Sequence, residues 1–203
     1  ESGKGTLNIG AGSTVISGES LEYTTLGHRA WSEGTAKVEG IGANWTINSR
    51  LLVGSFGKGT LTIGPGGTVN NTIGFIGSSA GSIGTVSVAG KNAVWNSSQA
   101  LEVGGYGTGS LNIGADGLVT TGLNGNIGFY AGSNGSVEIS GQNARWDVAG
   151  GTVNVGSSGA GALVINNGGT LNAGMNGQGV LRVGVSTGSG ALSVGAASID
   201  PNA

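Results

Sequence analysis

Acidic residues are the first candidates for chemistry, because glycoside hydrolysis uses two carboxylates that face one cleft. The chain has ten acidic residues, and after Glu39 they are scattered singly along the sequence. Glu102 and Glu138 each lie between two apolar residues, which places them on the outer side of a strand, where a charge serves solubility. We therefore expect no catalytic residues and a non-enzymatic protein.

Nucleophilic and metal-dependent chemistry is limited by the single histidine, His28, and by the absence of cysteine. A Ser-His-Asp triad would have to use His28, and the sequence offers no Gly-x-Ser-x-Gly turn between a strand and a helix. Zinc sites need several His or Cys ligands, and the calcium-binding nonapeptide is approached once, at residues 114–117. Glycine-rich strings such as residues 105–109 lack Gly-Lys-Ser/Thr and are typical of corners rather than phosphate cradles. We expect no cofactor and no metal.

One stretch, residues 19–39, concentrates charged and aromatic side chains. It carries six of the chain's eighteen charged residues in 21 positions, where even placement would put about two. Binding surfaces favour aromatic and Arg anchors, and loops on a regular scaffold are where function is usually found. The alternative is that an irregular coil is simply more solvated and more charged. The predicted partner-binding residues are Tyr23, His28, Arg29, Trp31 and Glu33.

These residues belong to a chain that is built of repeats. The string Gly-Thr-Leu-x-Ile-Gly begins at Gly5 and at Gly59, and it returns with Ser in place of Thr at Gly109. Similar strings that open with Gly and a small residue lie between these copies. The repeat unit is therefore about 25 residues, and two alternating types make a larger unit of about 50.

Tryptophan recurs in step with the repeat, at Trp45, Trp95 and Trp146. The residue two positions earlier is Ala each time, whereas the residue between them varies. Because successive side chains of a strand point to opposite faces, Ala and Trp are expected to face inward and the middle residue outward. We interpret the tryptophans as a buried stripe rather than a platform on which ligands stack.

Each repeat unit holds three short segments in which apolar residues alternate with Thr, Ser, Asn or Glu, the pattern of a strand with one buried face. Such short strands are stable only when stacked on their copies, which predicts three parallel ladders. The predicted fold class is all-β, a right-handed parallel β-helix (β-solenoid) of about eight coils, with about 25 residues per coil and two alternating coil types. The alternative is a four-bladed propeller, whose antiparallel blades would not give similar halves at 25 residues.

We expect a single domain over residues 1–203, with regular coils at 34–161 and irregular coils at 5–33 and 162–203. The core is expected to come mainly from the apolar positions of the first strand in each unit. These positions are Leu7, Ile9, Val38, Leu61, Ile63, Val86, Val88, Leu111, Ile113, Val137 and Ile139.

Composition excludes several function classes. With 8 basic and 10 acidic residues and a net charge of −2, the chain does not suit a nucleic-acid binder that neutralises phosphates. No apolar run approaches ~18 residues, so we expect no membrane insertion by this segment. No charged segment followed by an apolar stretch opens the chain, and any signal peptide is expected to have been removed.

The order Gly-Thr-Leu-x-Ile-Gly, Gly-Thr-Val, Ile-Gly, Thr-Val-x-Val, Asn-Ala-x-Trp and Leu-x-Val-Gly resembles a passenger-domain repeat of bacterial autotransporters, the type V secretion family. Residues 59–104 match nearly throughout, 109–156 match well, 5–54 match in part and 161–195 match weakly. The resemblance implies a right-handed parallel β-helix and export by a C-terminal outer-membrane β-barrel in the full-length chain. It also implies an extracellular location, either secreted or displayed on the bacterial outer surface.

Passengers of this family include adhesins, secreted enzymes and released angiogenic factors that act on endothelial growth-factor receptors. From the resemblance we expect a virulence factor that binds a host cell-surface protein or receptor through its outer face. Three alternatives stay open. They are a released ligand that activates a host endothelial growth-factor receptor, a passive stalk, and a polysaccharide-active enzyme.

Overall fold

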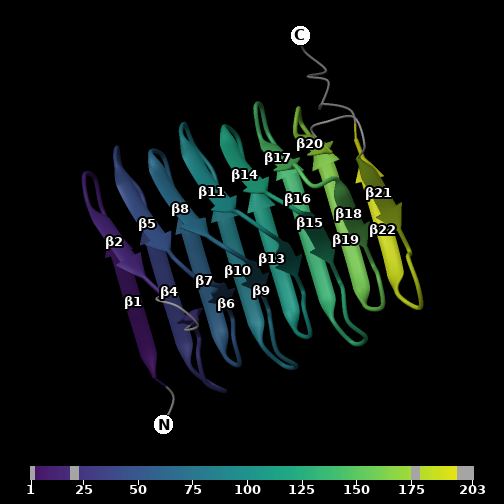
Figure 1. Ribbon diagram of the computed structural model, residues 1–203, viewed down its shortest axis with the longest axis horizontal. Coiled ribbons are helices and arrows are strands. Elements are labelled where there is room, and N and C mark those ends of the chain that lie inside the picture. Colours follow the sequence, from purple (N-terminus) through teal and green to yellow (C-terminus); the bar gives the residue numbers. More distant parts are fainter. Residues whose placement is uncertain (1–2, 19–22, 175–178, 196–203) are drawn as a thin grey trace, which may run out of the picture.

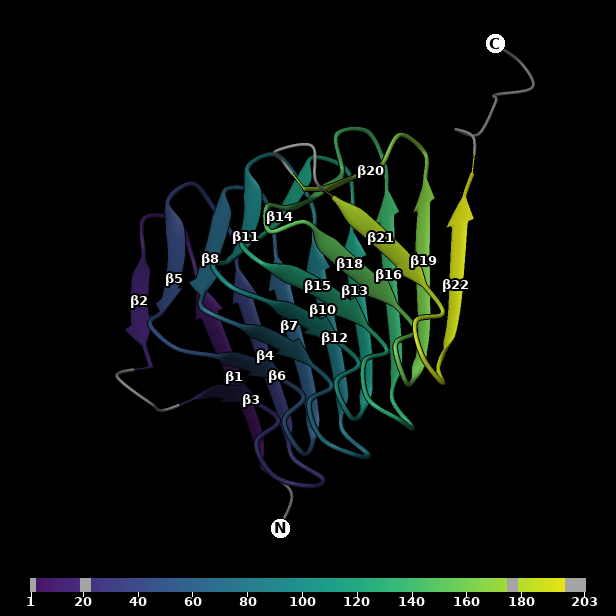
Figure 2. The same ribbon diagram turned by 45° about the vertical axis from the view of Figure 1, so that its right-hand side comes forward.

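The computed structural model describes residues 3–18, 23–174 and 179–195, which form 22 β-strands and, within those ranges, no helix. Figure 1 shows the strands stacked along the long axis of the molecule, from β1 at one end to β22 at the other. Figure 2 separates the three sheets that enclose the interior. The chain passes through them in turn, so each coil contributes one strand to each sheet.

The strands of the three sheets are as follows. The first sheet contains β1 (Lys4–Ile9), β4 (Glu33–Val38), β7 (Lys58–Ile63), β10 (Ile83–Val88), β13 (Thr108–Ile113), β16 (Asn134–Ser140), β19 (Ala160–Asn166) and β22 (Ser189–Val194). The second contains β2 (Thr14–Ser17), β5 (Ala43–Ile47), β8 (Gly67–Asn71), β11 (Ala93–Ser97), β14 (Gly117–Thr121), β17 (Arg145–Val148) and β20 (Thr170–Ala173). The third contains β3 (Thr24–Leu26), β6 (Leu51–Val53), β9 (Gly74–Ile76), β12 (Leu101–Val103), β15 (Asn124–Ile127), β18 (Thr152–Val155) and β21 (Val180–Val183).

The strand pairs of the described residues are parallel, and equivalent repeat positions lie opposite one another. Gly34 pairs with Gly59, and Gly59 pairs with Gly84. This register confirms the predicted parallel β-helix and shows that the propeller alternative, which needs antiparallel blades, is wrong. The solenoid makes about seven turns of roughly 26 residues rather than about eight coils. The reason is that the eighth row is represented in the described residues by β22 alone.

The core lies between the three sheets and is filled by alternate residues of every strand. Ten of the eleven predicted core positions are buried, and Leu7 is only partly buried. Leu7 belongs to β1, which has a neighbouring strand on one side only. Burial therefore follows the period-2 pattern of the sequence wherever a coil is covered by coils on both sides.

The tryptophan stripe is buried as predicted, with Trp45, Trp95 and Trp146 at most 2% exposed. Each indole N–H also donates a hydrogen bond to a side chain of the preceding coil. The Trp95 Nε1 to Asn71 Oδ1 distance is 2.6 Å, and the Trp146 Nε1 to Thr121 Oγ1 distance is 2.9 Å. These bonds satisfy the one polar atom of each indole. The stripe therefore links each coil that carries one of these tryptophans to the coil before it.

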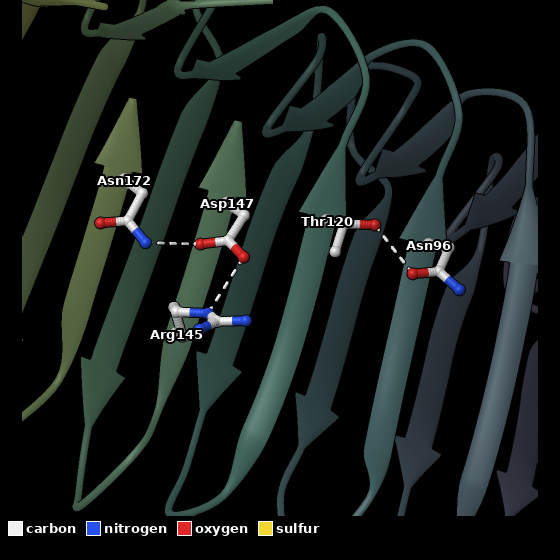
Figure 3. A network of polar contacts seen from close by, with 5 residues as sticks. All are labelled: Asn96, Thr120, Arg145, Asp147 and Asn172. Carbon is white, nitrogen blue, oxygen red and sulfur yellow. Dashed lines mark hydrogen bonds and ion pairs between the residues drawn. The ribbon is translucent and has the colours of Figure 1, made fainter. Parts of the chain in front are cut away.

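The outer face of the second sheet carries a ladder of polar side chains (Figure 3). Thr120 Oγ1 donates to Asn96 Oδ1 over 2.8 Å, and Asn172 Nδ2 donates to Asp147 Oδ1 over 2.7 Å. Arg145 Nε forms an ion pair with Asp147 Oδ2 at 3.0 Å. These side chains satisfy one another, so this face presents polar groups that are already paired.

Candidate ligand-binding groove

The corner that leads from the third sheet to the first has two lengths, which accounts for the two alternating coil types. A short corner occupies residues 54–57 and 104–107, and a long corner occupies residues 77–82 and 128–133. Each begins with a glycine at positive φ, for example Gly54 at 76°. A Cβ there would collide with the backbone of the following coil. The tight glycine turn lets the next residues project outward from the solenoid.

Aromatic side chains occupy several of these projecting positions. Phe56 and Tyr106 lie on short corners, and Phe129 and Tyr130 lie on a long one. The rings of Tyr106 and Tyr130 stack with centroids 4.0 Å apart and planes 3° apart, although their coils differ in type. The rings of Phe129 and Tyr130 are nearly perpendicular, with their centroids 4.7 Å apart. The corners of the fourth and fifth coils thus build an aromatic wall, and Phe56 lies two coils before it along the axis.

The outward residues in the middle of the third-sheet strands form a floor beside this wall. Register places Thr25 of β3 beside Leu52 of β6, Leu52 beside Phe75 of β9, and Phe75 beside Glu102 of β12. In contrast to the polar ladder of the second sheet, this row has two apolar side chains, Leu52 and Phe75, at its centre, and it continues beyond Glu102 with Asn126. The difference arises because these outward positions vary from coil to coil, whereas the inward positions repeat.

A second wall closes the other side of the floor. It contains Tyr23 and Arg50, with the guanidinium carbon of Arg50 5.5 Å from the centre of the Tyr23 ring, a cation–π arrangement. Floor and walls enclose a groove of about 450 Å³, within the size range of small-molecule sites. Aromatic rings with a few convergent polar groups are the usual lining of such sites.

Glu102 is the acidic residue of the groove. Burial raises the pKa of its carboxyl, and the positive charge of Arg50 acts in the opposite direction. Glu102 Oε2 is covered and has no hydrogen-bond partner among the described residues. Desolvation, followed by the charge of Glu102 and the phenol of Tyr106, raises the pKa of Tyr130. The groove therefore holds an acceptor that is not paired with any of the described residues.

The interpretation of Glu102 as a solubilising surface charge is wrong, whereas Glu138 is exposed as expected. Both side chains point away from the core, as the alternation predicts. Glu102 differs because Tyr106 and Tyr130 rise beside it and limit its access to water. Outward orientation and exposure are separate properties once corners build walls above a sheet.

The predicted partner-binding residues do not form a single site. Tyr23 and His28 line the groove, whereas Arg29 is exposed and lines neither the groove nor the neighbouring hollow described below. Glu19 and Glu22, which contributed to the charge of the same stretch, lie outside the described residues.

Trp31 and Glu33 line a separate hollow of about 230 Å³, and Phe56 separates this hollow from the groove because it lines both. Glu33 forms an ion pair of 2.9 Å with Lys4. The hydrogen bond and charge of Lys4 lower the pKa of the Glu33 carboxyl. The Glu33 carboxylate is thus paired with Lys4 on the first sheet. Trp31 is the other predicted residue that lines this hollow.

Trp31 adopts a backbone conformation that side chains rarely occupy, with φ at 66°. The matching positions of two later long corners are Gly81 and Gly132, at 77° and 79°. Trp31 is also 87% exposed, so packing does not compensate for the strain. A bulky residue at positive φ on the surface is a reason to look for function there.

Sequence reasoning missed most of the groove. The lining residues outside the predicted partner-binding set include Arg50, Phe56, Phe75, Glu102, Tyr106 and Tyr130. One signal could have found two of them: Phe56 and Tyr106 occupy the same place in two successive short corners, each two residues after the glycine that follows an apolar-x-Val segment.

Within residues 3–18, 23–174 and 179–195, no group of three or more His, Asp or Glu side chains could hold a metal ion. The same ranges contain no helix long and apolar enough to cross a bilayer. Comparison of the chain with protein-family models, with curated proteins and with solved structures gives no match.

Proposed function

We propose that this chain is a non-enzymatic extracellular binding protein, an autotransporter-type passenger that attaches to a host-cell surface or receptor through its outer face. The observation that carries the proposal is the groove over the third sheet. It brings aromatic rings from five successive coils together with Arg50 and a carboxyl oxygen of Glu102 that has no hydrogen-bond partner in the described part of the chain. Binding surfaces are enriched in such aromatic and Arg anchors.

Binding is favoured over catalysis by the acid content of the groove. Glu102 is the single carboxylate among the described residues that line it, whereas hydrolysis of a glycosidic bond uses two. A passive stalk is disfavoured because such a function does not need a groove lined with partly exposed aromatic rings. Tyr106 and Phe56 are 51% and 58% exposed, which leaves their surfaces available to a partner.

Binding of the labelled protein to cultured endothelial cells, followed by flow cytometry, tests the proposal. We expect saturable binding by the wild type, and about 30-fold weaker binding by Tyr106→Ala if this ring is an anchor worth ~2 kcal/mol. The control is Ile41→Ala, because Ile41 is 89% exposed at the corner between the first and second sheets. Absence of saturable binding, or equal binding by Tyr106→Ala, would contradict the proposal.

One further readout distinguishes an adhesin from the alternative function, a released ligand that activates an endothelial growth-factor receptor. Receptor tyrosine phosphorylation is measured on the same cells after addition of the protein. Phosphorylation that follows binding and is weakened in parallel by Tyr106→Ala would support an angiogenic ligand. Binding without phosphorylation would support an adhesin.

A further inference from the structure

We infer that the groove over the third sheet takes a neutral oligosaccharide, bound with its chain along the solenoid axis. This inference rests on the proposed function, because it assigns a ligand class to the same groove. The length of the groove, its aromatic rings, the balance of its charges and the paired strands beneath it all fit this class of ligand.

The aromatic rings provide stacking surfaces for sugar rings. The hydrophobic C–H faces of pyranoses pack on aromatic faces, whose electron density attracts weakly positive hydrogens. Tyr106 and Tyr130 are parallel to within 3°, so each ring keeps one face that is not stacked on the other. Phe75 on the floor and Phe56 at the rim add two more rings along the axis.

The polar groups of the groove suit hydroxyl groups. Arg50 can donate several hydrogen bonds, and the Glu102 carboxyl can accept them. Arg50 and Glu102 line the same groove, where burial raises the pKa of Glu102 and the positive charge of Arg50 acts to lower it. Because the two charges are opposite, they leave little net charge in the groove. A hydroxyl group both donates and accepts, which lets one kind of ligand pair with both residues.

The length of the groove indicates a chain of sugars rather than a single one. Its lining begins with Tyr23 in the first coil and ends with Tyr130 in the fifth. Four steps of about 4.8 Å between strands give a span of about 19 Å. Several sugar units are needed to cover rings distributed over that distance.

Two other classes of partner fit less well. An extended peptide gains affinity by pairing with a free sheet edge, but β9 beneath the groove is already paired with β6 and β12. A nucleic acid needs many phosphate contacts, and Arg50 is the single Lys or Arg among the described residues that line the groove. The chemistry of the groove therefore favours a neutral ligand rich in hydroxyl groups.

The test uses glycans released from the same endothelial cells, separated by anion exchange into neutral and acidic fractions and immobilised. We expect the wild type and Ile41→Ala to bind the neutral fraction saturably, and Tyr106→Ala to bind it at least tenfold more weakly. Glu102→Gln keeps the shape of the side chain and is expected to weaken binding less than Tyr106→Ala does. Free neutral hexasaccharides from that fraction should compete better than disaccharides.

The outcomes separate this inference from the proposed function. If the wild type binds whole cells through the groove but not the neutral fraction, the ligand is an acidic glycan or a protein, and only the oligosaccharide inference is overturned. If Tyr106→Ala binds the neutral fraction as well as the wild type does, the groove is not the glycan site and the inference is overturned. If whole cells are not bound, the proposed function fails, whatever the fractions show.

Discussion

Gly125 and Trp146 are predicted to be coupled across the core, so that adding a methyl group at Gly125 destabilises the protein unless the indole is made smaller. A Cβ at Gly125 would lie 2.6 Å from Trp146 Cζ2 and 2.7 Å from Cη2, closer than carbon atoms can pack. Overpacking of this kind costs about 1–3 kcal/mol. Gly125→Ala should therefore lower the free energy of unfolding by about 2 kcal/mol.

Trp146→Phe removes the ring edge that the new methyl group would meet. By itself it should also destabilise the protein, because it leaves a cavity and takes the indole donor from Thr121 Oγ1, now 2.9 Å away. Such a lost donor costs about 1–3 kcal/mol. In the double variant the alanine methyl fills part of the cavity. The combined loss should thus be smaller than the sum of the single losses by about 1–2 kcal/mol.

Urea unfolding followed by circular dichroism measures all four proteins of this cycle. The control is Gly5→Ala, because Gly5 also lies in a strand and a Cβ there has no atom within 4 Å. Its unfolding midpoint should stay close to that of the wild type. Equal stability of Gly125→Ala and Gly5→Ala, or additive losses in the double variant, would refute the packing argument.

Three further predictions concern other residues. Trp31→Gly should raise the unfolding free energy by about 1 kcal/mol, because it places Gly at positive φ; a lower thermal midpoint would contradict the strain at this position. Asn71→Ala should cost about 1–3 kcal/mol in urea unfolding, because the Trp95 indole loses its 2.6 Å acceptor, and an unchanged midpoint would show that water replaces it. Burial raises the folded pKa of Glu102 above 4.5, so the folded state binds more protons than the unfolded state above that pH. Stability of the wild type relative to Glu102→Gln should therefore fall as pH rises from 4.5 through the raised folded pKa; a difference that is flat with pH, or that grows, would contradict the burial of the carboxyl.

The solenoid could be predicted because its causes are local and repeated. Inward positions such as Leu61 and Val86 recur in step with the coil, and parallel stacking is the arrangement that places equivalent residues opposite one another. The tryptophan stripe followed from the Ala that lies two residues before Trp45, Trp95 and Trp146 alike. The acceptors of the indoles could not be predicted, because Asn71 and Thr121 come from the preceding coil and differ in type.

The groove could be predicted only in part, because it is built from positions that do not repeat. Tyr23 and His28 were found through the irregular composition of their stretch. Tyr106 and Tyr130 lie on corners of different length, so their stacking depends on how far each corner projects, which the sequence pattern does not encode. The outward position of Glu102 was predicted correctly, but its burial depends on these walls.

Hydroxyl-radical footprinting of the protein bound to plasma-membrane vesicles of endothelial cells tests most directly whether the groove is the binding surface. The side chains of Phe56 and Tyr106 are about half exposed in the free protein, whereas Ile41 is 89% exposed away from the groove. Binding should lower the oxidation of Phe56 and Tyr106 severalfold and leave Ile41 unchanged. Unchanged oxidation of Phe56 and Tyr106 on saturated vesicles would contradict the account.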